Sequence, residues 1–214
     1  DPKSARWAPP QRLTTNPGAD FNVVAATARS GRVWLAWQCW QKTDFAICAQ
    51  PLGVRTPPRV RNFPGSNEWH PAIAADSRGR LYVAFDTYSA GNYDVQLWTL
   101  DESSPRSSPG ETIPIAASAR FEARPSIAVD KLDRVWIAFE DSQPNWAKDF
   151  GSRWEGPSGV PFYMDRNILV RCLAGGKLQQ TQGEISSELI TTMYTPPEAQ
   201  RQRARMRQRV DRQG

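Results

Sequence analysis

Three carboxylates in the second half of the chain have the type and spacing that acid–base chemistry requires. Glu140 and Asp141 are adjacent, and Asp149 follows eight residues later. Most glycosidases use two carboxylates, one as acid and one as base or nucleophile. Carboxylates at strand ends are also common on solvated surfaces, so residue type alone does not distinguish a catalytic pair from solvated surface carboxylates. His70, the one histidine of the chain, is a further candidate base, with packing between its neighbours as the alternative.

No metal site and no cofactor is expected. A calcium site built from Asp86, Glu140 and Asp141 would need about six to eight oxygen ligands, and no Asp-rich loop of suitable spacing surrounds them. The three cysteines form no Cys-x-x-Cys pair, which disfavours zinc.

A sequence repeat determines how these residues are positioned. Three copies of a 17-residue pattern align without gaps, starting at Phe21, Trp69 and Ala123. They read FNVVAATARSGRVWLAW, WHPAIAADSRGRLYVAF and ARPSIAVDKLDRVWIAF. The offsets of 48 and 54 residues lie in the range of β-propeller blades.

Each copy predicts two strands joined by a polar turn, at which Gly31, Gly79 and Asp133 tolerate a positive φ. In copy two the second strand is apolar on both sides. Leu81, Val83 and Phe85 face one way, and Tyr82 and Ala84 the other. Such a strand must be covered on both faces, as it is when blades stack around an axis.

Further strands follow each pair. Third strands are expected at 44–52, 92–100 and 165–173, and fourth strands at about 59–63, 111–116 and 184–189. Four strands per repeat is the count of a propeller blade. The fold class is therefore all-β: a partial β-propeller of about three four-stranded blades, with a C-terminal basic tail that is helical or disordered. An antiparallel sandwich with similar hairpins is the alternative.

The repeats divide the chain into regions. Residues 1–19 form an N-terminal extension that could supply an outer strand, 20–190 form the propeller segment, and 191–214 form a basic tail or linker. The blades are expected at about 20–66, 67–120 and 121–190. Since propellers typically need ~4–8 blades, we expect further blades in the same polypeptide, with several chains completing one ring as the alternative.

The repeat resembles a known class of propellers. The pattern Pro-x-Ile-Ala-x-Asp-x-x-(Gly)-Arg-x-(Trp/Tyr)-(Val/Ile)-Ala-Phe-(Asp/Glu), followed by Asn-Tyr-Asp-Val, resembles blades of bacterial sialidase-like (Asp-box-related) extracytoplasmic propellers. The third copy, continued by FEDSQPNWAKDFG, is similar to propellers that precede a metal-dependent hydrolase-like domain. Two features depart from these families. The Asp-Gly turns lie between strands one and two rather than at the Asp-box position, and the sialidase catalytic residues cannot be assigned.

The resemblance implies that the loops entering strand one and joining strands two and three share a ligand face. On it we expect Glu68, Trp69, His70, Glu122 and Arg124 before the first strands, and Asp86, Glu140 and Asp141 after the second strands. An insertion at about 142–164 adds aromatic and charged residues, which suit a ligand wall; anchoring of this loop to the next blade is the alternative. The candidate ligand-binding residues are Trp69, His70, Arg124, Glu140, Trp146, Lys148, Asp149 and Trp154.

Two alternatives remain for the cysteines. Cys39 and Cys48 could face each other across a hairpin and form a disulfide, which would imply an oxidising compartment, and Cys172 would then remain single. Three reduced, buried thiols are equally consistent with the sequence. We expect an extracytoplasmic location, periplasmic or secreted.

The net charge of +5 is concentrated in the tail. Residues 196–214 carry six arginines against two acidic residues, which indicates a solvated helix or a linker. A contact with nucleic acid is not expected, because the tail lacks the aromatic residues that stack on bases. No apolar run approaches the ~20 residues of a membrane helix.

These observations predict a non-catalytic binding or scaffolding module of a larger secreted bacterial protein, with carbohydrate as the leading ligand class. The alternatives are a sialidase-like glycoside hydrolase, with the three carboxylates on the propeller face, and a structural platform for protein partners. The expected partners are a carbohydrate or protein ligand, the remaining blades and a further domain of the same polypeptide.

Overall fold

The computed structural model describes residues 9–104, 110–144 and 166–180, which form twelve β-strands and no helix. The strands are β1 (Asp20–Thr27), β2 (Val33–Gln41), β3 (Asp44–Pro51), β4 (Arg59–Arg61), β5 (Asn67–Ala75), β6 (Arg80–Ser89), β7 (Asn92–Asp101), β8 (Glu111–Ala116), β9 (Phe121–Val129), β10 (Val135–Ser142), β11 (Asn167–Ala174) and β12 (Lys177–Gln180). No helix of the described part is long and apolar enough to cross a membrane.

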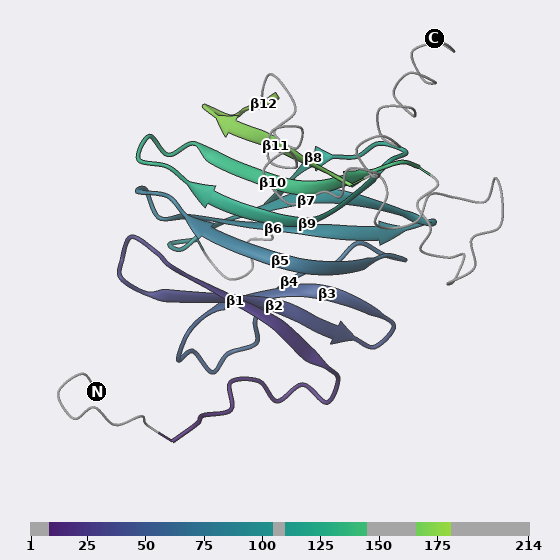
Figure 1. The fold of residues 1–214 in the computed structure, drawn as a ribbon. Coiled ribbons are helices and arrows are strands. Elements are labelled where there is room, and N and C mark those ends of the chain that lie inside the picture. The colour runs from purple at the N-terminus through teal and green to yellow at the C-terminus, as the bar shows by residue number, and fades with distance from the viewer. Residues whose placement is uncertain (1–8, 105–109, 145–165, 181–214) are drawn as a thin grey trace, which may run out of the picture.

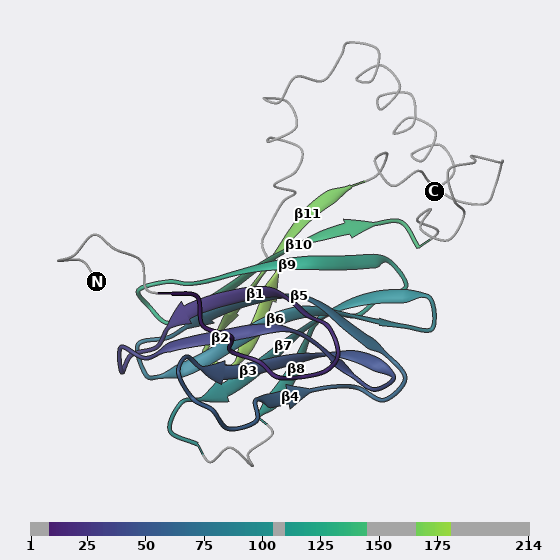
Figure 2. The same cartoon turned by 90° about the horizontal axis from the view of Figure 1, so that it is seen from below.

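The strands form three four-stranded antiparallel sheets in the order β1-β2-β3-β4, β5-β6-β7-β8 and β9-β10-β11-β12. We call these sheets blades one, two and three. Figure 1 shows them stacked one upon the next, from purple to green along the chain. The first strands lie side by side, β1 next to β5 and β5 next to β9, as Figure 2 also shows. This arrangement confirms the predicted partial propeller of three blades.

The second strands are buried on both faces, as their sequences predicted. Leu81, Val83 and Phe85 pack against blade one, around Trp34 and Ile47. The other face of the same strand belongs to a second core. There Tyr82 and Ala84 pack with Val135, Ile137 and Phe139 of blade three. Each blade junction therefore has its own apolar core, which accounts for second strands that are apolar at nearly every position.

An aspartate closes the first hairpin of blades two and three. Asp130 accepts the main-chain N–H groups of Leu132 and Arg134, and the indole N–H of Trp136 at 3.0 Å. Asp76 does the same in blade two, with the hydroxyl of Tyr82 as its side-chain partner.

In blade one Ala28 replaces this aspartate. The indole N–H of Trp34 is buried there without a hydrogen-bond partner among the described residues. The turn residues adopt the predicted positive φ, 79° at Gly31, 89° at Gly79 and 57° at Asp133. A Cβ at Gly79 would lie 2.8 Å from a carboxylate oxygen at the end of the Glu102 side chain, which would have to move.

Two predicted boundaries were wrong. The first strands start earlier than expected, so Glu68, Trp69 and His70 lie within β5 rather than in a loop before it, and Glu122 and Arg124 lie within β9. Asp86, Glu140 and Asp141 likewise lie within β6 and β10. The pairing continues through these polar residues because each first strand contains a β-bulge, which absorbs one irregular step without ending the strand.

The fourth strand of blade three also differs from the prediction. It is Lys177–Gln180, which pairs with β11, because Gly175 and Gly176 close a tight turn directly after β11. The predicted strand at 184–189, the insertion at 145–165 and the tail lie outside the described residues.

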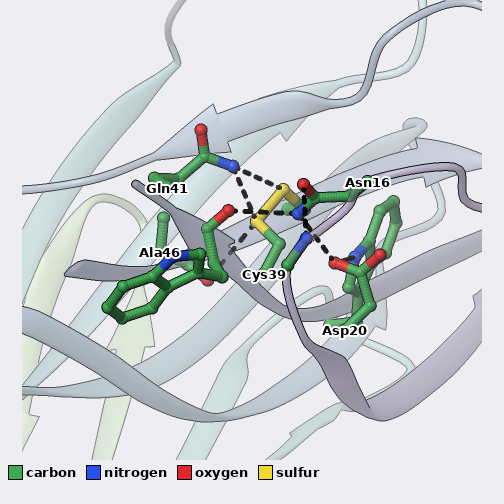
Figure 3. Close-up of a disulfide and its surroundings, with 9 residues drawn as sticks. Asn16, Asp20, Cys39, Gln41 and Ala46 are labelled. Atoms are coloured by element: carbon green, nitrogen blue, oxygen red, sulfur yellow. Dashed lines mark hydrogen bonds between the residues drawn. A yellow bond between two sulfur atoms is a disulfide. The ribbon is translucent and has the colours of Figure 1, made fainter. Parts of the chain in front are cut away.

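Cys39 on β2 and Cys48 on β3 form a disulfide, with their Cα atoms 6.0 Å apart (Figure 3). Next to it, the side chain of Asn16 donates to the main-chain carbonyl of Trp40 at 3.0 Å, and Asp20 accepts the indole N–H of Trp37 at 3.2 Å. These contacts hold the segment before β1 against blade one. Cys172 is a free, buried thiol, and its burial raises its pKa.

Candidate functional site

Each first strand carries a residue in the left-handed region at the same position of the repeat. These residues are Asn22 (φ 53°), His70 (φ 46°) and Arg124 (φ 53°). Such a conformation costs roughly 1–3 kcal/mol when the residue is not glycine, and such strain concentrates at functional sites. Its occurrence in all three blades indicates that the bulge serves a common purpose.

The bulged residues are joined by side chains at a second repeated position, near the end of each second strand. Gln38 accepts a hydrogen bond from the side-chain amide of Asn22 in its own blade, at 2.5 Å, and from the main-chain N–H of His70 in the next blade, at 3.1 Å. Asp86 repeats the pattern. It lies 3.0 Å from Nδ1 of His70 and accepts the main-chain N–H of Arg124 at 3.3 Å. Each of these two acceptor side chains therefore binds the bulged residue of its own blade and the bulged residue of the next blade.

Glu140 occupies the same repeated position in blade three as Gln38 and Asp86 do in blades one and two. Arg124 approaches its carboxylate at 3.4 Å, and Arg166, which precedes β11, forms a second ion pair with it. Desolvation lowers the pKa of the Arg166 guanidinium, and the nearby Glu140 opposes this shift. We refer to Asn22, Gln38, His70, Asp86, Arg124 and Glu140 as the polar row.

The polar row is accessible on one side and supported on the other. The side chains of His70 and Arg124 are 40% and 45% exposed, while that of Asp86 is fully buried. A buried carboxylate that receives hydrogen bonds fixes the orientation of the groups that it binds. The row therefore presents an amide, an imidazole and a guanidinium in defined positions, all suited to hydrogen-bonding a ligand.

Aromatic side chains flank Asn22 and His70 of the polar row. The ring of Phe45 lies 5.3 Å from Phe21, 4.9 Å from Trp40 and 5.3 Å from Trp69. We refer to these four residues as the aromatic cluster. Phe21 is 38% exposed and directly precedes Asn22. Trp69 directly precedes His70 in the same way. The aromatic cluster therefore adjoins the polar row along the first strands of blades one and two.

A buried carboxyl group lies next to the cluster in sequence. Glu68 is completely buried and accepts hydrogen bonds from Ser66 and, at 3.4 Å, from the main-chain N–H of Phe63. Burial raises its pKa from 4.5 to about 7, and these hydrogen bonds limit the rise. One of its oxygens has no hydrogen-bond partner among the described residues. The group has no access to solvent, so it cannot reach a ligand directly.

The structure brings some of the predicted site residues together and separates others. Trp69, His70, Arg124 and Glu140 lie in or beside the polar row. Asp141 does not pair with Glu140, because adjacent residues of a strand point to opposite faces. It is bound instead by Arg120, through two hydrogen bonds of 2.8 and 2.7 Å. Trp146, Lys148, Asp149 and Trp154 lie outside the described residues.

Several residues of the site were not identified from the sequence. Asn22, Gln38 and Arg166 were not proposed, and neither were Phe21, Trp40 and Phe45. The signal was present in the alignment of the copies, where Asn22, His70 and Arg124 share one column and Gln38, Asp86 and Glu140 another. The residues of the first column differ in identity, but all three side chains can donate a hydrogen bond.

Comparisons with known proteins support the fold. No protein-family model matches the chain, and no curated protein matches it. A thermostable family-43 glycoside hydrolase superposes with a TM-score of 0.52 and 11% sequence identity, over 80% of this chain and 61% of that one.

Two further structures are less similar. An endo-1,4-β-xylanase from Bacteroides thetaiotaomicron gives a TM-score of 0.49 at 10% identity, over 85% of this chain and 64% of that one. A xylan β-1,4-xylosidase from Bacillus halodurans gives 0.46 at 12% identity, over 75% and 33%. The chain thus spans less than two thirds of the length of each of these proteins. The similarity to the family-43 hydrolase supports a propeller-type fold and not the sialidase type in particular.

Proposed function

We propose that this chain is a carbohydrate-binding β-propeller module whose site is the polar row together with the aromatic cluster. The observation that carries the proposal is their adjacency: a repeated set of oriented hydrogen-bonding side chains directly follows partly exposed aromatic rings. Ligand sites combine apolar and aromatic surface with a few well-placed polar groups.

Sugars match this combination closely. The C–H face of a pyranose stacks on an aromatic ring, and its hydroxyl groups form paired hydrogen bonds with planar side chains. Phe21 and Trp69 would supply the stacking surface. Asn22, His70 and Arg124 would bind hydroxyl groups from positions that Gln38, Asp86 and Glu140 fix.

The propeller similarity to a family-43 glycoside hydrolase supports a carbohydrate as the ligand class. Binding without hydrolysis is favoured by the surroundings of the carboxylates. Glu140 is paired with Arg124 and Arg166, and Asp141 with Arg120. Both carboxylates are thus engaged by arginine side chains, and they point to opposite faces of β10 rather than forming the facing pair that most glycosidases use.

We also propose that the chain is located outside the cytoplasm. The Cys39–Cys48 disulfide supports it, because such bonds persist in oxidising compartments.

Calorimetric titration with a panel of neutral and acidic oligosaccharides tests the function. We expect one or more of them to bind, and we expect Phe21→Ala and Arg124→Gln each to weaken binding about tenfold, or ~1.4 kcal/mol. The matched control is Leu178→Ala, an exposed apolar residue on the outermost strand of blade three, which should bind as the unmodified protein does.

Two results would contradict the proposal. If no saccharide binds while a protein partner does, the chain is an interaction platform. If the titrated saccharides are cleaved and Glu140→Gln abolishes the cleavage, the chain is a glycoside hydrolase rather than a binding module.

A further inference from the structure

The hairpins between the second and third strands of blades one and two carry the same pair of aromatic residues. Trp40 on β2 is paired with Phe45 on β3, and their ring centroids lie 4.9 Å apart. Tyr88 on β6 is paired with Tyr93 on β7 in the same way, with ring centroids 4.6 Å apart. Both tyrosines lie 48 residues after their counterparts, which is the offset of the repeat. The aromatic pair is therefore a repeated feature of the first two blades.

Each pair is completed by a third ring from the first strand of the next blade. The ring of Phe45 lies 5.3 Å from that of Trp69 on β5. The ring of Tyr93 lies 5.3 Å from that of Phe121 on β9. We call Tyr88, Tyr93 and Phe121 the tyrosine cluster. Its two tyrosines are half-buried, whereas Phe121 is buried. The tyrosine cluster thus lies at the junction of blades two and three, as the aromatic cluster lies at the junction of blades one and two.

The two clusters stand in the same relation to the polar row. Trp40 lies two residues after Gln38 on β2. Tyr88 lies two residues after Asp86 on β6. Residues two apart on a strand share a face, so each cluster adjoins one acceptor of the row. His70 is bound by both acceptors, through its main-chain N–H to Gln38 and through Nδ1 to Asp86. The imidazole of His70 therefore belongs to the surroundings of both clusters.

In blade three the two positions of the pair hold other residue types. Ser142 stands at the position of Tyr88, and Arg166 stands at that of Tyr93. The guanidinium carbon of Arg166 lies 4.4 Å from the centroid of the Phe121 ring, so a charged group borders the tyrosine cluster on this side. Among the described residues, the aromatic pairs are confined to blades one and two.

We infer that the site binds an oligosaccharide of at least two sugar units, one unit at each cluster, with His70 between them. The inference rests on the proposed function and adds the length of the saccharide that the site takes. At each junction a half-buried aromatic pair offers apolar surface beside an oriented polar group, which is the composition of a ligand site. A chain that reaches both clusters makes its second contact as an intramolecular event, so it binds more tightly than a single unit does.

Calorimetric titration with one saccharide at increasing chain length tests the inference. The probe is the homologous series, from one to six sugar units, of the saccharide that binds in the calorimetric panel described above. The affinity should rise by about tenfold or more from the single unit to the chain that spans both clusters, and it should then level off. Tyr88→Ala and Phe21→Ala should each remove this rise, because each variant retains only one complete cluster.

The matched control is Tyr88→Phe, which keeps the ring and should therefore retain the rise. Near-UV circular dichroism identifies a variant that has failed to fold. If Tyr88→Ala fails to fold, Tyr88→Leu replaces it, because leucine keeps apolar volume but not the flat ring.

The possible outcomes separate this inference from the proposed function. An affinity that is the same at every chain length would overturn the inference, as would a Tyr88→Ala variant that shows the full rise. In both cases a saccharide still binds, so the proposed function stands. If no saccharide binds at any length, the proposed function fails and the inference fails with it.

Discussion

Replacing Glu68 with glutamine isolates the effect of burying an ionisable group in this fold. Glu68 is completely buried, and its pKa is raised from 4.5 to about 7, mainly by desolvation. The amide of glutamine keeps an acceptor for the Ser66 hydroxyl and the main-chain N–H of Phe63 but carries no charge at any pH.

The sign of the effect follows from proton binding. Between pH 4.5 and about 7 the folded state holds a proton on Glu68 that the unfolded state has released. The free energy of unfolding therefore falls as pH rises through this interval and levels off above it. At about 1.4 kcal/mol per pH unit, the total loss is about 3 kcal/mol. Glu68→Gln should lack this loss, so it should gain about 3 kcal/mol over the unmodified protein between pH 4.5 and pH 8.

Urea unfolding followed by tryptophan fluorescence at pH 4.5, 6 and 8 measures this difference. Glu111→Gln, at an exposed position of β8, is the matched control for replacing a glutamate with glutamine. If the stability difference between Glu68→Gln and the unmodified protein is the same at pH 4.5 and pH 8, then Glu68 does not titrate as a buried acid and the reasoning fails.

Three other substitutions test the packing of the blades by chemical or thermal unfolding. Ala28→Asp should stabilise the protein by about 1–2 kcal/mol, because it supplies an acceptor for the orphaned indole N–H of Trp34; in a Trp34→Phe background the gain should vanish. Asp86→Ala should cost about 3 kcal/mol, since it removes the acceptor that joins two blades, and a cost below 1 kcal/mol would contradict that role. Replacing Cys39 and Cys48 with serine should cost about 2–3 kcal/mol for a loop of this length, and reductant should then have no further effect.

The propeller itself could be predicted from the sequence because its strongest constraint is local. A second strand that is apolar at both odd and even positions, such as 81–85, requires cover on both faces, and three copies at blade spacing indicate stacked sheets. The positive φ at Asp133 was predictable for the same reason, since the gapless alignment places it opposite Gly79.

The site was harder to predict because its defining feature is an irregularity. A β-bulge at His70 leaves no periodic signature, so the polar residues around it were read as loops although the strand continues through them. The assignment of Asp86 to an interblade contact depends on the main-chain N–H of Arg124, 38 residues away in sequence. Residue types alone do not reveal such a contact. The Cys39–Cys48 disulfide was one of two alternatives, because hairpin register decides whether two cysteines meet.

The binding of a saccharide to the polar row is tested most directly by the nuclear magnetic resonance signals of His70. The chain has one histidine, so the imidazole signals belong to this residue without further assignment. Titration with an oligosaccharide that binds in calorimetry should shift the His70 ring signals in proportion to the bound fraction, and Arg124→Gln should weaken the shift and the heat together. Full binding with unchanged His70 signals would place the ligand elsewhere and contradict the account of this site.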